Sequence, residues 1–305
     1  MLNLPTSFFL QVKNYDNILL SAINTDSLFS SLPIYYALRK LGKNVHLAVY
    51  SQTDFQKMPD EAQPVVVSQV LIGANSIFNK NPGDYYPEGD LAKWLKETQK
   101  INTNVWMFRK TGANQLRISY KQLIERFKAQ AIILVDNNFE SLIQLPEDGF
   151  GKSVDGHINL ASLNSIEIPK FLISTGFGVE KRLSYYNILK NISNVNKQGG
   201  LFGSCSLLNF MNCFKFYKDA IANSWNESEY NNKIIGAAEG EFVDDETIHL
   251  ISPLINQYWF FNGDAIIYNN QLISYIEDSV TYDEAMQEIF PRIQAVIGDR
   301  KFLPY

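Results

Sequence analysis

The strongest constraint on the fold is a run of five apolar residues, Ala131 to Val135, that ends at Asp136. The run does not alternate between apolar and polar residues, which is typical of a central parallel strand covered on both faces. Parallel neighbours cannot be joined by a tight hairpin, so the chain between them must cross over, usually as a helix. The sequence therefore predicts an open α/β sheet.

The same alternation of strand and helix recurs along the chain. Residues 17–23 form a short apolar run, apolar residues follow at helical spacing from Asp26 to Leu41, and residues 44–50 predict a second strand. Further strands are expected at 65–72, 105–108, 171–175 and 201–205, and further helices at 88–100, 114–128 and 183–196. The pattern predicts a doubly wound, mostly parallel, Rossmann-like sheet.

The pattern becomes mainly helical beyond about residue 210. We expect a single α/β domain over 1–305, with a sheet core over about 15–210 and a helical C-terminal extension over about 211–305. The aromatic residues of that extension include Tyr258 to Phe261. They are interpreted either as packing or as an aromatic pocket.

Composition narrows the classes of function. The chain is 46% hydrophobic, enough to fold without a partner, and its formal net charge is −5 with no basic stripe, which makes nucleic acid an unexpected partner. Its longest apolar runs fall far short of the roughly 20 residues that span a bilayer. No secretory signal is recognised at the N-terminus, and Cys205 and Cys213 lack the spacing of a zinc site. A cytoplasmic protein is expected, and a homodimer is possible on general grounds.

Polar residues follow the predicted strands, and in open parallel sheets ligands bind beyond the carboxyl ends of the strands. Asp136, Glu88 and Asp26 are the candidate acid, base or metal-binding carboxylates. The expected ligand-binding residues, which lie just after strand ends, are Asn24, Thr25, Ser27, Thr111, Asn137, Asn138, Glu140, Ser141, Gly176 and Gly178. Asn24 to Ser27 could hold a phosphate at a helix N-terminus or simply cap that helix.

The common fingerprints of cofactor and hydrolase sites are missing from the sequence. The turn after the first strand has neither the GxGxxG nor the P-loop pattern, and no GxSxG elbow occurs. His46, His157 and His249 lack ligand spacing, so none is assigned to a metal. Tyr85 to Gly89 presents two aromatics and a carboxylate, either as a binding loop or as an ordinary helix start. No particular cofactor is indicated.

Several short motifs in a fixed order resemble the family known as domain of unknown function 1152, over residues 17–292. The resemblance rests on Leu32 to Arg39, Asn44 to Ala48, Tyr86 to Gly89, Lys110 to Gly112, Ala131 to Asp136, Gly176 to Gly178, Gly199-Gly200, Glu239-Gly240, Ser252 to Leu254 and Tyr258-Trp259. It implies a Rossmann-like fold. In typical members it also implies a glycine-rich turn with an aspartate after the first strand and an Asp-Gly-Gly turn after the central strand.

This sequence departs from the family at those two turns. The glycine-rich stretch aligns with Ile23-Asn24-Thr25 and its aspartate with Ser27, while the second turn reads Asp136-Asn137-Asn138. Side chains at positions of glycine would partly block the close approach of a ligand to the backbone. The activity of the parent family is therefore expected to be altered or lost.

Two functions follow from this sequence. The first is binding of a small phosphorylated or nucleotide-like ligand at the carboxyl rim, with carboxylate- or metal-assisted chemistry. The alternative is a catalytically degenerate member that acts as a protein-interaction or regulatory factor. Phe139 and Ile23 filling the crevice would count against an enzyme. Exposed aromatics at Tyr85, Tyr86 and Tyr258 to Phe261 would favour an interface.

Overall fold

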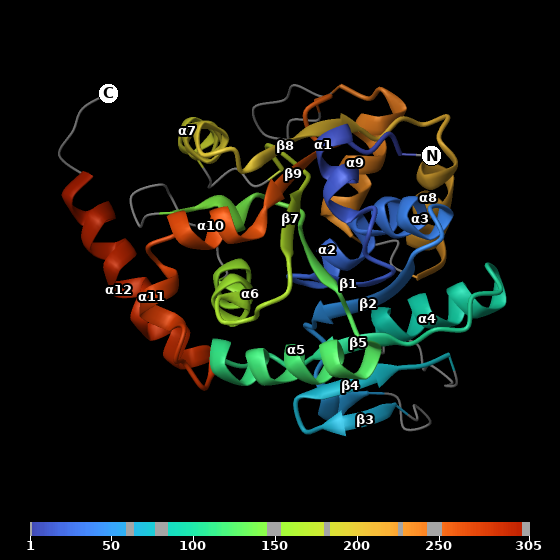
Figure 1. Cartoon of the computed structure of the whole chain (residues 1–305), viewed down its shortest axis with the longest axis horizontal. Coiled ribbons are helices and arrows are strands. Elements are labelled where there is room, and N and C mark those ends of the chain that lie inside the picture. The colour runs from blue at the N-terminus through green and yellow to red at the C-terminus, as the bar shows by residue number, and fades with distance from the viewer. Residues whose placement is uncertain are drawn as a thin grey trace.

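The computed structural model describes residues 2–58, 64–76, 85–144, 154–179, 184–224, 228–242 and 252–300, with backbone alone for residue 57 and residues 293–300. The described residues form one nine-stranded sheet (Figure 1). From edge to edge its strands are β3 (Val65–Ser68), β4 (Leu71–Ala74), β5 (Val105–Phe108), β2 (Asn44–Tyr50), β1 (Asn17–Ala22), β6 (Ala131–Asp136), β7 (Lys170–Ser174), β9 (Gln257–Asn262) and β8 (Leu201–Ser206).

The centre of the sheet is parallel. Ile18 of β1 is paired with Val45 of β2 on one side and with Ala131 of β6 on the other. β5 and β7 extend the parallel part outward, whereas β3, β4 and β9 run antiparallel to their neighbours. The chain leaves β1 for β2 in one direction and later reaches β6 in the other, so strand order reverses between β1 and β6. That reversal is where open α/β sheets usually bind ligands.

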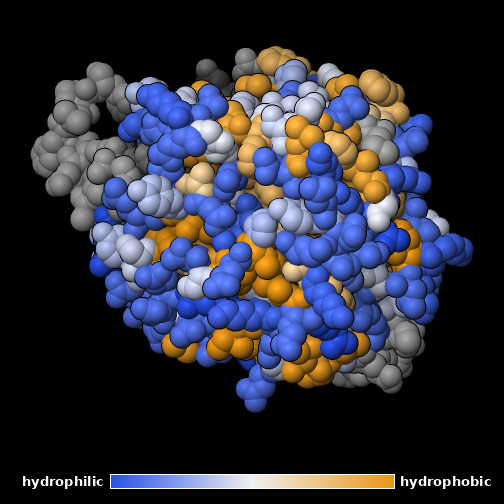
Figure 2. Space-filling model, viewed as in Figure 1, coloured by the Kyte–Doolittle hydropathy of each residue, from blue (hydrophilic) through white to orange (hydrophobic). Residues whose placement is uncertain are grey.

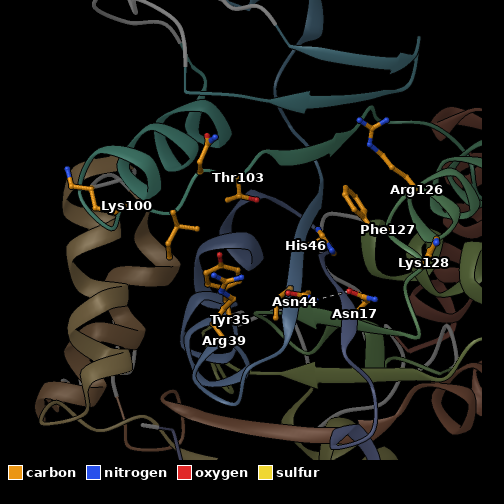
Figure 3. A pocket seen from close by; sticks show the side chains of 13 residues that line it. Asn17, Tyr35, Arg39, Asn44, His46, Lys100, Thr103, Arg126, Phe127 and Lys128 are labelled. Atoms are coloured by element: carbon orange, nitrogen blue, oxygen red, sulfur yellow. Dashed lines mark hydrogen bonds between the residues drawn. The ribbon is translucent and has the colours of Figure 1, made fainter.

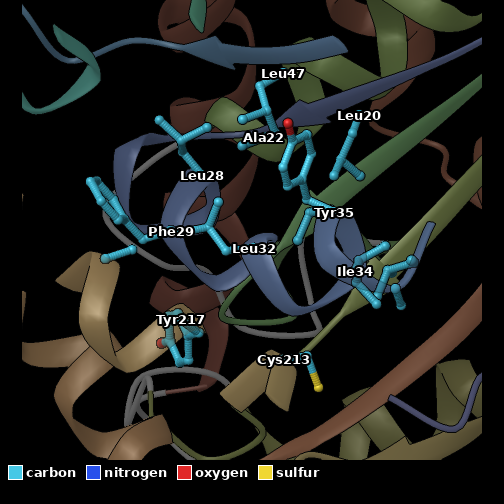
Figure 4. Close-up of a cluster of buried hydrophobic side chains, with 14 of the residues drawn as sticks. Leu20, Ala22, Leu28, Phe29, Leu32, Ile34, Tyr35, Leu47, Cys213 and Tyr217 are labelled. Carbon is cyan, nitrogen blue, oxygen red and sulfur yellow. The ribbon is translucent and has the colours of Figure 1, made fainter. Parts of the chain in front are cut away.

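Successive residues of β1 point to opposite faces, because side chains alternate along a strand. Ile18, Leu20 and Ala22 join one apolar core, and Leu19 and Ile23 join the other. The first core (Figure 4) is covered by α1 (Thr6–Val12), α2 (Thr25–Ser30), α3 (Leu32–Lys40), α4 (Pro87–Glu97), α8 (Asn212–Ser224) and α9 (Glu229–Glu239). The second is covered by α5 (Ala113–Phe127), α6 (Asp155–Leu163), α7 (Tyr185–Lys197), α10 (Gly263–Asn269), α11 (Ile273–Ile276) and α12 (Tyr282–Arg300). Two 3-10 turns, η1 (Phe55–Lys57) and η2 (Glu140–Leu142), follow β2 and β6.

The predicted α/β class and the mostly parallel, doubly wound sheet are confirmed. Two local predictions need correction. The expected strand at 65–72 is the hairpin of β3 and β4. The sheet also does not end near residue 210, because β9 returns from the C-terminal part and pairs with both β7 and β8. Its aromatics pack on both faces of the sheet: Tyr258 and Phe260 join the first core, and Phe261 joins the second.

The surface agrees with a chain whose apolar residues are largely used in the two cores. Figure 2 shows a face on which hydrophilic residues predominate and hydrophobic residues lie in small groups. Within the described part of the chain, no helix combines the length and apolar character needed to cross a bilayer.

Replacing Phe260 tests the place of β9 in the core. Its ring is fully buried and packs against Phe8 with 4.7 Å between ring centroids. Phe260→Ala should lower the free energy of unfolding by about 3–5 kcal/mol, as measured by denaturant titration. The control Phe210→Ala removes a ring that is 71% exposed and should cost less than about 0.5 kcal/mol. Equal effects of the two changes would contradict the position of β9.

Candidate functional site

The turn after β6 is organised by the carboxylate of Asp136. The backbone N–H of Asn138 donates to Oδ1 at 2.9 Å, and that of Ser141 donates to Oδ2 at 2.7 Å. Asp136 is fully buried, and this burial raises the pKa of its carboxyl group while the hydrogen bonds oppose the rise. The predicted catalytic carboxylate therefore holds its own turn together, because both of its oxygens accept bonds from the turn backbone.

This turn is fastened to the turns on either side of it. The hydroxyl of Ser27, after β1, donates to Asn137 Oδ1 at 3.0 Å and accepts from the Asn137 N–H at 3.3 Å. On the β7 side, Gly176 has φ of +74°, and a Cβ there would lie 2.2 Å from the Asn137 carbonyl oxygen. The loops after β1, β6 and β7 are thus in direct contact at the point of strand reversal.

Apolar side chains also pack at the point where these three loops meet. Ile23 and Phe139 are both fully buried. Phe139 adopts φ of 65° and packs edge-to-face on Phe177, with ring centroids 5.4 Å apart. Both side chains belong to the second apolar core, and Ile23 stands at a position that aligns with the glycine-rich stretch of the family.

Glu88 is the centre of a second polar group on the β2 side of the rim. Its carboxylate accepts from Thr25 Oγ1 at 3.3 Å, from Ser51 Oγ at 2.7 Å and from Thr53 Oγ1 at 2.7 Å. The side chain is fully buried, and burial raises the pKa of Glu88 although the three hydroxyls oppose the rise. Sequence reasoning missed Ser51 and Thr53. Their position directly after the second strand was the signal that places them on this rim.

Asp26 belongs to a different set of contacts. Ser228 Oγ donates to Asp26 Oδ1, and Asn231 Nδ2 donates to the same oxygen at 3.3 Å, so the carboxylate fastens α2 to α9. Burial raises the pKa of Asp26. The side chain of Asn24 accepts the N–H of Ser27 at 2.8 Å, which is the helix-capping role.

Glu140 lies in a third polar group, together with the acidic Asp155 and the basic Lys110. Burial raises the pKa of Glu140 well above its ordinary value, and repulsion from Asp155 and Asp136 adds to the effect. Among the described residues its Oε1 has no hydrogen-bond partner. Lys110 forms an ion pair with Asp155 and lies over the Tyr50 ring, 4.7 Å from its centroid. Within the described segments, Lys110 is the cation that lowers the pKa of Glu140, against the opposing charges of Asp155 and Asp136.

The remaining predicted residues contact other parts of the chain. Thr111 Oγ1 donates to the Val280 carbonyl at 3.0 Å, and Gly112 N–H donates to the same oxygen at 3.0 Å. The Gly178 carbonyl accepts from the Tyr185 hydroxyl at 3.1 Å. Thr111 and Gly178 thus help to attach the C-terminal segment and α7 to the rim.

The three candidate carboxylates accept hydrogen bonds from different residues. Glu88, Asp26 and Asp136 each have their own hydrogen-bond partners. Within the residues that the structure describes, no group of three or more His, Cys, Asp or Glu side chains is arranged to hold a metal ion. His249 lies outside the described residues.

The sheet order and the two helical layers define a doubly wound, Rossmann-like α/β protein. The sequence model described as "Protein of unknown function (DUF1152)" matches residues 88–294, and the chain belongs to this family. No match was found among curated proteins or among solved structures. The matched region begins at Glu88, so the divergent turn after β1 lies before it.

Two glycines with similar backbone conformations test the closure of the rim. Gly199 has φ of +71° with no atom within 4 Å of an added Cβ, so Gly199→Ala should cost only the strain of the left-handed backbone, about 1–2 kcal/mol. Gly176→Ala should cost about 1–3 kcal/mol more, because the methyl group collides with Asn137. Equal losses in denaturant titrations would show that the β6 turn is not packed on β7.

The pH dependence of stability tests the buried state of Glu140. Its pKa in the folded protein lies above the ordinary 4.5, so its contribution to stability is complete below that pH and is lost as pH rises through the folded pKa. Glu140→Gln removes this loss. The variant should be more stable than the native protein by about 1–3 kcal/mol near pH 8, and the difference should shrink toward pH 4. Exposed Glu125→Gln controls for the loss of one charge, and a pH-independent difference for Glu140→Gln would refute the assignment.

Proposed function

We propose that this chain binds a small polar molecule at the carboxyl rim, beside Tyr85 and Glu88. The observation that carries the proposal is the buried Glu88 carboxyl group, which is held by hydroxyls from the loops after two neighbouring strands. Buried groups of raised pKa gather at functional sites, and Glu88 is fully buried with a raised pKa. A ligand would contact the polar groups that lie between the buried Glu88 and the solvent.

Tyr85 provides the accessible part of this site. Its side chain is 45% exposed, and its hydroxyl donates to Gln52 Oε1 at 3.5 Å. Burial, and then the proximity of Glu88, raise the pKa of the Tyr85 phenol, so the phenol stays protonated and can donate a hydrogen bond. The raised pKa of Glu88 means that its carboxyl group keeps a proton to higher pH than an exposed glutamate does. Proton transfer is the chemistry that this pair could supply.

The charge of the rim restricts the ligand. Asp26 and Glu88 both lie close enough to Tyr85 to raise its pKa further. A hydroxyl-bearing, nucleoside-like group suits these partners, whereas a phosphate would have to extend away from the carboxyl groups. The phosphorylated ligand expected from the sequence is therefore proposed only with its phosphate outside this acidic group.

The alternative function, a degenerate family member that binds a protein partner, is supported by Ile23 and Phe139, which are buried in the second core at the strand ends. The aromatics expected to form its interface give it little support. Tyr86, Tyr258, Phe260 and Phe261 are buried, and of that group Tyr85 is the exposed one. We also propose a cytoplasmic location, which the free thiols of Cys205 and Cys213 support because disulfides are rare there.

A thermal-shift screen of nucleosides, nucleotides, sugars and sugar phosphates tests the binding proposal. A ligand at a hundred times its Kd should add about 2.7 kcal/mol to stability and raise the Tm by a few degrees. Each shift is measured against the baseline of the same variant. Glu88→Gln and Tyr85→Phe should reduce the shift, whereas Tyr186→Phe, on a side chain 75% exposed in α7, should not. No stabilising compound, or an equal shift in all variants, would favour the partner-binding function.

A further inference from the structure

A hollow of about 550 Å³ lies at the end of the sheet opposite to the carboxyl rim, where the parallel strands begin. We call it the amino-edge hollow. Figure 3 shows how separate elements surround it. Asn17 begins β1, Asn44 and His46 come from the start of β2, and Arg39 and Arg126 come from the last turns of α3 and α5. The lining thus combines amide, imidazole and guanidinium groups from elements distant in sequence.

The lining of this hollow is basic in an acidic protein. Four cations, Arg39, Lys100, Arg126 and Lys128, line it together with no Asp or Glu residue. Over the described part of the chain, none of these four forms an ion pair with a carboxylate. The nearby acidic residue Asp16 faces Lys43 at 3.7 Å instead. Unpaired cations around a concave surface are the arrangement that attracts an anion.

Helix ends explain only part of this charge. Helices in a parallel α/β sheet end at this edge, and a cation near a helix C-terminus is stabilised by the helix dipole. Lys100 Nζ serves in this way, because it donates to the Glu97 carbonyl at the end of α4 at 2.7 Å. The C-termini of α3, α4 and α5 together contribute roughly −1.5 charges. The four cations exceed this, so the hollow keeps a net positive potential.

Two of the lysines that line the hollow have a left-handed backbone conformation. Lys100 and Lys128 have φ of 59° and 49°, a region that favours glycine or asparagine. Only one other non-glycine residue, Phe139, has positive φ among the described residues. Keeping lysine at such a position costs roughly 1–2 kcal/mol relative to glycine. Lys128 is the left-handed C-cap of α5 and Lys100 follows the end of α4, so both conformations end helices and place lysines beside the hollow.

Aromatic rings hold part of the lining in place. The His46 ring stacks on Phe127 with 3.8 Å between centroids, and Arg126 lies over the Trp106 ring at 5.0 Å. A second hollow of about 250 Å³ shares Arg39 with the first and is lined by Tyr36 and Phe216. Arg39 therefore lies between a polar, basic hollow and an aromatic one.

We propose that this amino-edge hollow binds a small phosphate-bearing molecule across the starts of β1 and β2, with Arg39 as the anion donor on the α3 side of the sheet and Arg126 as the anion donor on the α5 side. Guanidinium groups match phosphate geometry through paired N–H donors. The volume lies within the range of small-ligand sites and is concave, which suits a compact anion better than a polymer. Asn17 and Asn44, joined by a hydrogen bond of 3.1 Å, offer further polar groups on the same side.

Calorimetric titration with inorganic pyrophosphate tests this site. Arg39→Gln and Arg126→Gln should each weaken the Kd by about tenfold to a hundredfold, and the double variant should abolish binding. Arg292→Gln is the matched control, because Arg292 pairs with Glu288 on α12 and lines neither hollow. Glu88→Gln should leave the Kd unchanged, which separates this site from the carboxyl rim. Absence of binding, or binding retained by the double variant, would overturn the proposal.

The His46 imidazole gives a second readout inside the hollow. Burial and the neighbouring Arg39 charge lower the pKa of His46. The negative charge of a bound anion stabilises the imidazolium and opposes the effect of Arg39, so pyrophosphate should raise the His46 pKa in a nuclear magnetic resonance titration. His157 is buried against the Ile143 carbonyl and should not respond. An unchanged His46 signal at saturating pyrophosphate would place the anion elsewhere and refute the assignment.

Discussion

The hydrogen bonds from the backbone N–H groups of Asn138 and Ser141 to the buried Asp136 carboxylate determine the shape of the whole carboxyl rim. A buried carboxylate is costly to keep in an apolar interior unless donors satisfy it, and here the turn supplies those donors from its own backbone. The turn that results presents Asn137 to Ser27 on one side and to Gly176 on the other. Loops after three neighbouring strands are thereby joined where an open α/β sheet would ordinarily leave a crevice.

Closing that crevice leaves polar groups of opposite charge at the two edges of the sheet. The carboxyl rim keeps the buried Glu88 with its three hydroxyl donors and the half-exposed Tyr85. The amino edge gathers four cations around a hollow without a carboxylate. Anion binding, which a helix N-terminus often provides at the carboxyl rim, is better supported at the other edge in this chain because carboxyl groups crowd the rim. The two proposed sites therefore lie at opposite ends of the parallel strands and differ in charge.

Much of the fold could be predicted from the sequence, because β6 and its neighbours are uniformly apolar and the helices between them are amphipathic. β9 could not, since its aromatic run QYWFFN has no period that distinguishes a strand from a buried helix. α6 was also missed, because all nine of its residues are buried and no polar face marks it.

The rim positions were predictable from strand ends, but the partners of each side chain were not. Whether Asp136 faces a ligand or its own backbone depends on the local turn, and Ser51 and Thr53 become relevant only once Glu88 is seen between them. The basic hollow was hidden because its residues are scattered between Asn17 and Lys128.

Hydrogen exchange at the amides of Asn138 and Ser141 tests the central claim most directly. Both N–H groups are bound to a fully buried carboxylate, so they should exchange as slowly as the interior amides of β6, such as Ile133, and should open only with the sheet. Exchange of these two amides near the rate of an unstructured peptide, while Ile133 stays protected, would show that the β6 turn opens on its own. The crevice would then be available to a ligand, and the account of a closed rim would be wrong.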